Sequence, residues 1–261
     1  MREGQERPTI ALVLGAGSAR GLAHIGVLQV LIENQVPLDF IVGSSMGAMV
    51  GGIYASGADV KMLDRMIENM DTSIFFDVHI PRLGFIAGKK IKSFLDLVTK
   101  KKNFAELNLP LIAVATDLLS GERILLDEGS VAEAIRASIS IPGVFHPVKR
   151  DGMMLVDGAV ADRLPVEAAR SRGADVVIAV DVTFSEGKEV VIKNTMDVIL
   201  TSLDIMAKQQ FELIYPQVDV LIQPKVNGFS PRDFEKSRQI VDLGRAAAEE
   251  KLDEIKSKIV I

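Results

Sequence analysis

Five nearly uninterrupted apolar runs, separated by helix-like patterns, restrict the fold of this chain more than any other feature. They lie at residues 10–14, 40–42, 111–115, 176–180 and 218–222. Such runs are typical of strands in a parallel sheet, because both faces of each strand are buried. Helices between the strands then cover the two faces. The sequence therefore predicts an α/β fold, a three-layer α/β/α sandwich with a mostly parallel central sheet.

The segments between these runs carry the expected helices. The strongest patterns follow Gly21 and Ser45, and others occupy residues 131–137, 195–214 and 232–255. Residues 118–126 differ, because they resemble two short strands joined at Ser120 and Gly121.

The composition fits one catalytic domain over residues 1–261, with residues 1–8 as a flexible N-terminus. The chain has 261 residues, of which 48% are hydrophobic, so it can bury a sizeable core. Its net charge of -5 argues against nucleic acid as a partner. The early apolar run is too short for a membrane span or a signal peptide, so we expect a cytoplasmic location.

The absence of cysteine excludes disulfides and thiolate metal sites. No cluster of metal-ligand residues stands out, so we expect no metal, no calcium requirement and no cofactor. The oligomeric state is left open by the sequence.

One strand-to-helix junction carries a candidate nucleophile. The run at 40–42 leads into Gly-Ser-Ser-Met-Gly at residues 43–47, and a helix-like stretch follows. A serine on such a sharp turn projects its Oγ away from the sheet, and glycines on either side remove obstructing Cβ atoms. We therefore predict Ser45 as the nucleophile and Gly43 and Gly47 as its elbow. On this pattern alone, an ordinary turn of small residues is the alternative.

The histidines do not fit an ordinary hydrolase triad, which runs Ser, Asp or Glu, then His along the chain. They are His24, His79 and His146, so the triad carboxylate would have to precede residue 146. His24 falls in an apolar helical pattern, where we expect a core histidine. The remaining option is a serine activated directly by a carboxylate in a partly desolvated pocket.

Two further segments could complete such a site. The first run ends in a loop of small residues at 15–21, whose amides could converge on an anion at the start of a helix. A strand-like run at 153–156 ends in Asp157 and Gly158, which places a carboxylate at a strand end. A simple Asx turn is the alternative there.

With these motifs in order, the chain resembles the patatin-like phospholipase family, and specifically its small bacterial members. The resemblance implies that Ser45 is the nucleophile and Asp157 its base. It also implies that the amides of Gly17, Ser18 and Ala19 form an oxyanion hole, and that the substrate is a fatty-acyl ester of a (lyso)phospholipid or related lipid, met at a membrane surface. The motifs that carry it are residues 15–21, 43–47, 137–145 and 157–158.

This chain departs from the family pattern in the Gly-rich loop. The family usually has three glycines where this chain has Ala16, Gly17 and Ser18. Backbone N–H groups survive these changes, so we expect a working site. Arg20, followed by Gly21, has two possible roles: it could bond loop carbonyls and hold the hole in shape, or it could contact a phosphate.

Two other functions compete with this hypothesis. Gly15, Gly17 and Gly21 resemble a dinucleotide-binding turn, but their spacing differs from that fingerprint, and Asp39 stands at the start of the second strand. A catalytically inert regulatory protein on a membrane surface is the second alternative, because the departures lie in the oxyanion loop. The apolar segment 71–87 has no clean period, and it could cover an acyl chain or pack on the core.

Overall fold

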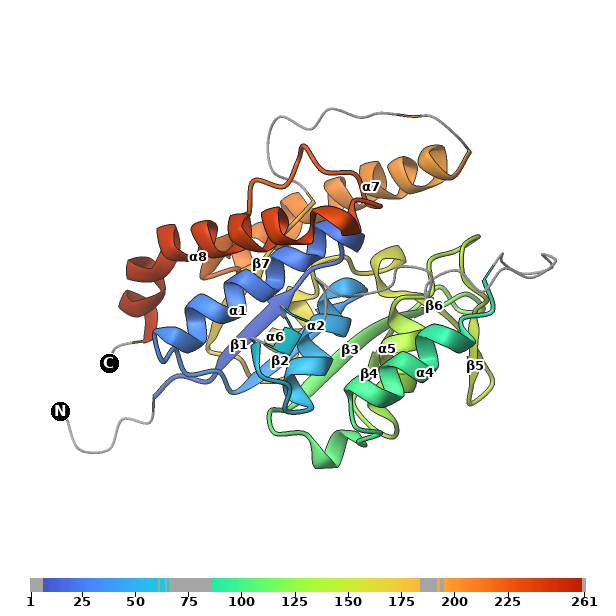
Figure 1. Ribbon diagram of the computed structural model, residues 1–261, viewed down its shortest axis with the longest axis horizontal. Helices are drawn as coiled ribbons and strands as arrows, with labels where there is room; N and C mark the ends of the chain where they lie inside the picture. The colour runs from blue at the N-terminus through green and yellow to red at the C-terminus, as the bar shows by residue number, and fades with distance from the viewer. Residues whose placement is uncertain are drawn as a thin grey trace.

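The computed structural model describes residues 7–60, 62, 63, 65, 86–183, 192 and 195–259, to which all structural statements here refer (Figure 1). Most of the predicted flexible N-terminus, His79 and residues 71–85 of the predicted acyl cover lie outside these residues.

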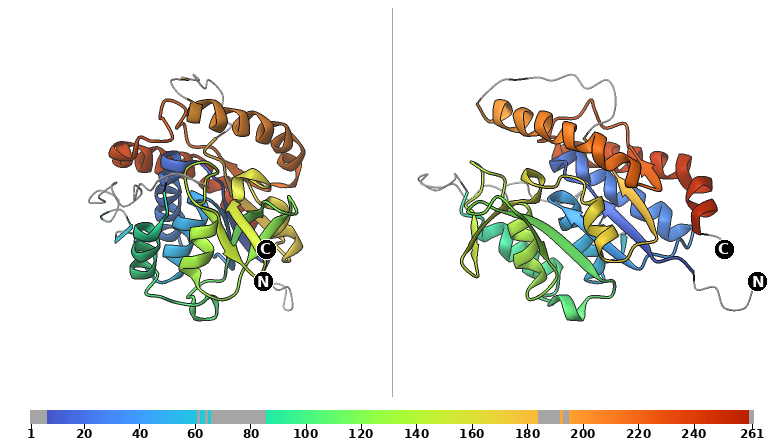
Figure 2. Two further views of the ribbon diagram at one scale, coloured as in Figure 1. Left: turned by 90° about the vertical axis from the view of Figure 1, so that its right-hand side faces the viewer. Right: turned by 180° about the vertical axis from the view of Figure 1, so that it is seen from behind.

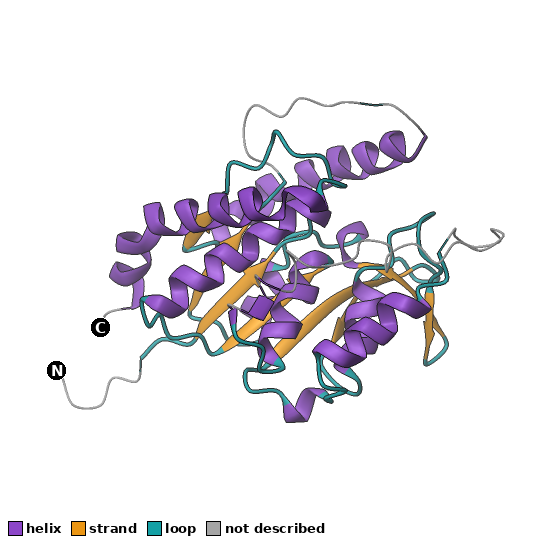
Figure 3. Ribbon diagram, viewed as in Figure 1, coloured by secondary structure: helices purple, strands orange, loops and turns teal. Residues whose placement is uncertain are grey.

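An eight-stranded sheet forms the centre of the molecule (Figure 3). Its strand order is β5-β6-β3-β2-β1-β7-β8, and β4 also pairs with β3. The strands are β1 Ile10–Leu14, β2 Phe40–Ser44, β3 Leu111–Asp117, β4 Arg123–Leu126, β5 Val148–Arg150, β6 Met153–Asp157, β7 Val176–Val180 and β8 Val220–Ile222.

The sheet is parallel from β3 through β2, β1 and β7 to β8. The strands β4, β5 and β6 pair antiparallel at the other end. The predicted α/β fold with a mostly parallel sheet is thus confirmed, and the antiparallel end is an addition to it.

Helices cover both faces of the sheet (Figure 2). Strand β1 illustrates why its residues are all apolar: Ile10, Leu12 and Leu14 join one core, and Ala11 and Val13 join the other. The first core packs against α1, α2, α4, α5 and α8, and the second against α6 and Phe211 of α7. The helices are α1 Ala23–Glu33, α2 Met46–Ala55, α4 Lys89–Val98, α5 Val131–Ser138, α6 Val166–Ser171, α7 Thr195–Ile214 and α8 Ser237–Ile259.

The prediction of two short strands within residues 118–126 is wrong in its first half. Strand β3 extends to Asp117 and pairs directly with β4, so Leu118 and Leu119 lie in the turn between them. The Asp117 carboxylate accepts the N–H of Leu119 and of Ser120, which stabilises a turn where the apolar residues alone favoured a strand.

The last helix begins later than predicted, at Ser237 rather than residue 232. The Asp233 carboxylate accepts the Ser230 N–H, and Phe234–Lys236 form a 3-10 turn before the helix. A local side-chain hydrogen bond thus competes with helix formation there. The short elements β5, α4 and α6 were not predicted.

Two glycines allow α1 and α8 to pack closely. A Cβ atom on Gly26 would lie 2.0 Å from the carbonyl oxygen of Val241, and one on Gly244 would lie 2.0 Å from that of Ala23. Since both obstacles are backbone atoms, neither helix can accept a side chain at these positions without moving apart.

We predict that Gly26→Ala lowers the free energy of unfolding by about 1–3 kcal/mol, because the added methyl group forces the two helices apart. Chemical denaturation measures this change. Gly228→Ala is the control, since no atom of the described residues lies within 4 Å of a Cβ atom there. Equal stability of the two variants would contradict close packing at Gly26.

Candidate active site

Ser45 occupies a strained turn between β2 and α2. Its φ of 54° and ψ of -118° lie in a region that residues other than glycine rarely adopt. A Cβ atom on Gly47 would lie 2.0 Å from the carbonyl oxygen of Leu14, and one on Gly43 would lie 2.5 Å from the backbone nitrogen of Ala48. The sharp turn therefore requires glycine at both predicted elbow positions.

The pairing of β3 brings a carboxylate to this turn. The N-terminal part of β3 pairs with β2, and the register ends with Val114 opposite Ser44. The next residue, Ala115, lies opposite Asp157 of β6. Strand β4 pairs with the other edge of β3 at these residues. Strand β6 therefore pairs with the same edge of β3 as β2 does, directly beyond the end of β2. The ends of β2 and β6 consequently meet.

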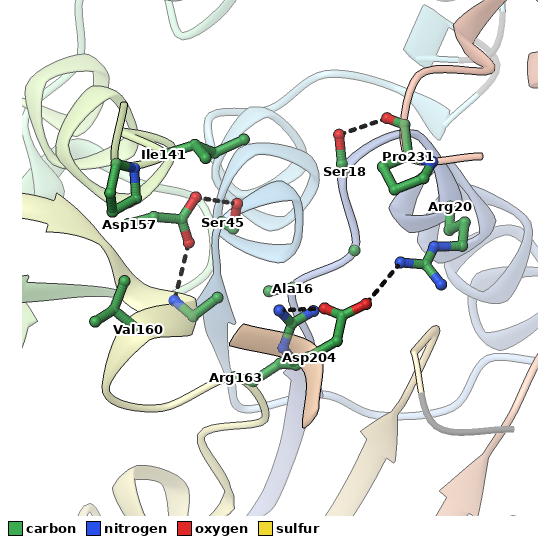
Figure 4. A pocket seen from close by; sticks show the side chains of 13 residues that line it. Ala16, Ser18, Arg20, Ser45, Ile141, Asp157, Val160, Arg163, Asp204 and Pro231 are labelled. Carbon is green, nitrogen blue, oxygen red and sulfur yellow. Dashed lines mark hydrogen bonds and ion pairs between the residues drawn. The ribbon is translucent and has the colours of Figure 1, made fainter. Parts of the chain in front are cut away.

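At this meeting point the Ser45 hydroxyl donates a hydrogen bond of 2.6 Å to Oδ2 of Asp157 (Figure 4). The second carboxylate oxygen, Oδ1, accepts the Ala159 N–H at 2.9 Å. The carboxylate thus forms an Asx-type turn and also contacts the serine. A Cβ atom on Gly158 would lie 2.3 Å from the Val114 carbonyl oxygen, so glycine lets the turn rest on β3.

Burial makes this carboxylate a better base than an exposed one. Asp157 is 3% exposed and Ser45 is 6% exposed. Burial raises the pKa of Asp157 to about 6, although hydrogen bonds from Ser45 and Ala159 act in the opposite direction. At neutral pH the group is still ionised, and it accepts a proton more readily than an ordinary aspartate.

Ser138, at the end of α5, holds the nucleophile turn in place. Its hydroxyl accepts the Ser45 N–H at 2.9 Å and donates to the Val114 carbonyl at 2.5 Å. It therefore links the turn to β3, the same strand that positions Asp157. Beyond this helix, Ile141 and Pro142 line the pocket around Ser45.

The Gly-rich loop lines the same pocket. Among the described residues, the N–H groups of Gly17 and Ser18 have no hydrogen-bond acceptor. The Ala19 N–H differs, because it donates to the Pro231 carbonyl at 3.2 Å. The Ser18 hydroxyl donates to that same oxygen at 2.7 Å. The serine that departs from the family pattern thus ties the loop to the segment before α8.

Two residues fix this loop on the elbow and the sheet. A Cβ atom on Gly21 would lie 2.6 Å from Cγ of Met46, so glycine lets the loop approach the residue after the nucleophile. The His24 ring lies 2.7 Å from the Gly15 carbonyl through Nε2 and is fully buried. Burial lowers the pKa of His24 to about 4, so the neutral ring donates from Nε2. The predicted core histidine is confirmed.

Arg20 pairs with Asp204 of α7 (Figure 4). Its Nη2 lies 3.7 Å from Oδ2 of Asp204, and Nη2 of Arg163 lies 2.7 Å from Oδ1 of the same carboxylate. Asp204 thus joins the Gly-rich loop to the chain after Asp157. Neither Asp204 nor Arg163 carries a local sequence signal, so sequence reasoning missed both.

The competing candidates lie elsewhere. His146 lines a different pocket from Ser45, beside Arg136. Asp39, the residue weighed for ribose binding, accepts the Ile10 N–H at 2.7 Å and pairs with Arg7, which places it at the start of β1. It therefore lies at the opposite end of the parallel strands from Ser45. Within the described ranges, no three His, Asp or Glu side chains gather as metal ligands, and no helix is long and apolar enough to cross a bilayer.

Comparison with known proteins identifies the family of this chain. The family model described as patatin-like phospholipase matches residues 12–170, which is more than half of the chain. The chain belongs to the patatin-like phospholipase family. An uncharacterized NTE family protein of Mycobacterium tuberculosis is 39% identical over 185 residues, covering 70% of this chain and 51% of that protein. Human patatin-like phospholipase domain-containing protein 6 is 31% identical over 269 residues, covering 90% of this chain and 20% of its own length.

Solved structures share the patatin-like fold at low sequence identity. VipD from Legionella pneumophila matches with a TM-score of 0.62 and 14% identity, covering 97% of this chain and 67% of VipD. Full-length ExoU from Pseudomonas aeruginosa matches with a TM-score of 0.55 and 14% identity, covering 98% of this chain and 54% of ExoU. The chain thus spans about half of the mycobacterial relative and a fifth of the human one. Family membership supports a lipid hydrolase.

We predict that Ser138→Ala lowers the free energy of unfolding by about 1–3 kcal/mol, because it leaves the buried Ser45 N–H without an acceptor. Urea denaturation measures the change. Ser257→Ala is the matched control, since its exposed hydroxyl donates to the Glu254 carbonyl at the surface of α8. If the two variants were equally stable, the hydroxyl of Ser138 would not support the turn.

Proposed function

We propose that this patatin-like protein is a serine acyl hydrolase that cleaves fatty-acyl esters of (lyso)phospholipids or related lipids. The observation that carries the proposal is the 2.6 Å hydrogen bond between the Ser45 hydroxyl and the buried carboxylate of Asp157. The amides of Gly17 and Ser18 in the same pocket support it, because neither has an acceptor within the described part of the chain.

In the proposed acylation step, Oγ of Ser45 attacks the ester carbonyl while Oδ2 of Asp157 takes its proton. The negative charge that develops on the carbonyl oxygen is stabilised by the Gly17 and Ser18 amides. Ala19 can join them only if Pro231 moves, since its amide is already engaged. Asp157 then returns the proton to the leaving alcohol, and the acyl group stays on Ser45.

In the second step, Asp157 takes a proton from water, and the resulting nucleophile attacks the acyl-enzyme. The fatty acid leaves and Ser45 regains its proton. The hydrogen bond from Ala159 holds Oδ1, which keeps Oδ2 directed at Ser45 throughout. One oxyanion donor is typically worth ~10²–10³ in turnover and a general base ~10²–10⁴, so both parts are needed.

We predict that a fluorophosphonate probe labels Ser45, and that Ser45→Ala abolishes labelling and ester hydrolysis. Mass spectrometry of the labelled peptide locates the modified serine. A folded protein that resists the probe would instead be the inert regulatory form, and labelling of Ser44 or Ser138 would show that the nucleophile assignment is wrong.

Asp157→Asn should lower turnover by ~10² or more, because the amide keeps the shape of the side chain but cannot take the proton. His146→Gln is the control and should change turnover little, since His146 lies in another pocket. Steady-state kinetics on a soluble short-chain ester measures both. A loss at His146 that matched the loss at Asp157 would refute the dyad.

A further inference from the structure

Helix α7 lies along the outside of the molecule (Figure 2). Its described side chains differ between two long faces. With 3.6 residues per turn, Asp204, Ala207 and Phe211 lie on one side of the helix. Ala207 is buried, and Phe211 packs against the core on the second face of the sheet. This side therefore attaches α7 to the protein.

On the opposite side, the described residues of α7 include four exposed apolar side chains. Ile205 is 61% exposed and Met206 is 65% exposed, and one to two turns earlier Val198 and Ile199 are also exposed. Ser202, which lies between them, is exposed and uncharged. We call Val198, Ile199, Ile205 and Met206 the outer face of α7. Large apolar side chains gathered on one exposed face mark an interaction surface.

The outer face lies close to the catalytic pocket. Asp204, on the attached side of the same helix, lines the pocket together with Ser45 and Asp157. Its carboxylate pairs with Arg163 at 2.7 Å, which fixes the helix beside the pocket. A surface that touches the outer face is thus about one helix diameter, roughly 10 Å, from the pocket wall.

The size of the outer face and the charge beside it indicate which class of partner can bind there. A stable protein dimer buries about 800 Å² on each side, contributed by about 20–30 residues. Four side chains on one helix fall far short of that. A lipid surface needs no such area, since an amphipathic helix lies in it with one apolar face buried. Lys208, exposed one turn from Ile205, can reach the phosphates of head groups.

We propose that the outer face of α7 docks on a phospholipid surface and thereby keeps the catalytic pocket close to its substrate. This inference rests on the proposed function, because it names where the proposed lipid hydrolase meets its lipid. The attached side of α7 stays on the protein, and the outer face enters the head-group region.

Co-sedimentation with phosphatidylcholine vesicles tests the proposal. All proteins carry Ser45→Ala, so that the vesicles stay intact. Adding Ile205→Ser and Met206→Ser should weaken binding by about tenfold or more, since two large apolar side chains no longer enter the lipid. Val198→Ser with Ile199→Ser should weaken it as well, and this pair carries the test if the first pair does not fold.

Leu97→Ser is the matched control, because Leu97 is an apolar residue 76% exposed on α4. It should leave vesicle binding unchanged. The proposal is overturned if the Ser45→Ala parent does not sediment with vesicles, or if Leu97→Ser weakens binding as much as the α7 pairs. It is also overturned if the α7 pairs change the oligomeric state in gel filtration and not the vesicle binding.

Hydrolysis of a water-soluble short-chain ester by the protein with Ser45 intact separates the two proposals. The α7 pairs should leave this activity unchanged, because no lipid surface is involved. If the soluble ester is not cleaved while vesicle binding behaves as expected, the proposed function fails and the docking surface stands. If the soluble ester is cleaved but the vesicles are not bound, the docking surface fails and the proposed function stands.

Discussion

Along one edge of β3 the pairing strand changes from β2 to β6, and the candidate site depends on this change. Val114 pairs with Ser44 at the end of β2, and the next residue, Ala115, pairs with Asp157 at the end of β6. The backbone hydrogen bonds of β3 thus bring together the ends of β2 and β6, which are distant in sequence. Ser138 adds to this arrangement, because it bonds both the nucleophile turn and Val114.

In the proposed mechanism, this arrangement takes the place of a histidine base. The sheet and its helices bury the carboxylate, and burial raises the pKa of Asp157 to about 6. An exposed aspartate has a lower pKa and is a weaker base. A buried aspartate without hydrogen bonds would have a higher pKa and would be protonated. The hydrogen bonds from Ser45 and Ala159 keep Asp157 between these limits. His24 instead holds the Gly-rich loop, because its ring donates a hydrogen bond to the Gly15 carbonyl.

Local patterns in the sequence predicted the fold and part of the site. The uninterrupted apolar runs predicted the sheet, and the paired glycines around Ser45 predicted a turn that the backbone confirms. The contacts of Ser138, Asp204 and Pro231 could not be predicted, because each forms only after folding. The turn at Leu118 was missed for a related reason, since the Asp117 carboxylate outweighs the apolar pattern.

The central claim is that the buried carboxylate of Asp157 activates Ser45. The rate at which a fluorophosphonate modifies Ser45, measured against pH, tests it most directly. Since only the ionised carboxylate accepts the proton, the rate should rise with pH to a plateau with a midpoint of about 6, the pKa of Asp157. The Asp157→Asn variant should react slowly at every pH, without this midpoint. A midpoint that persists in Asp157→Asn, or that moves in a histidine variant instead, would contradict the account.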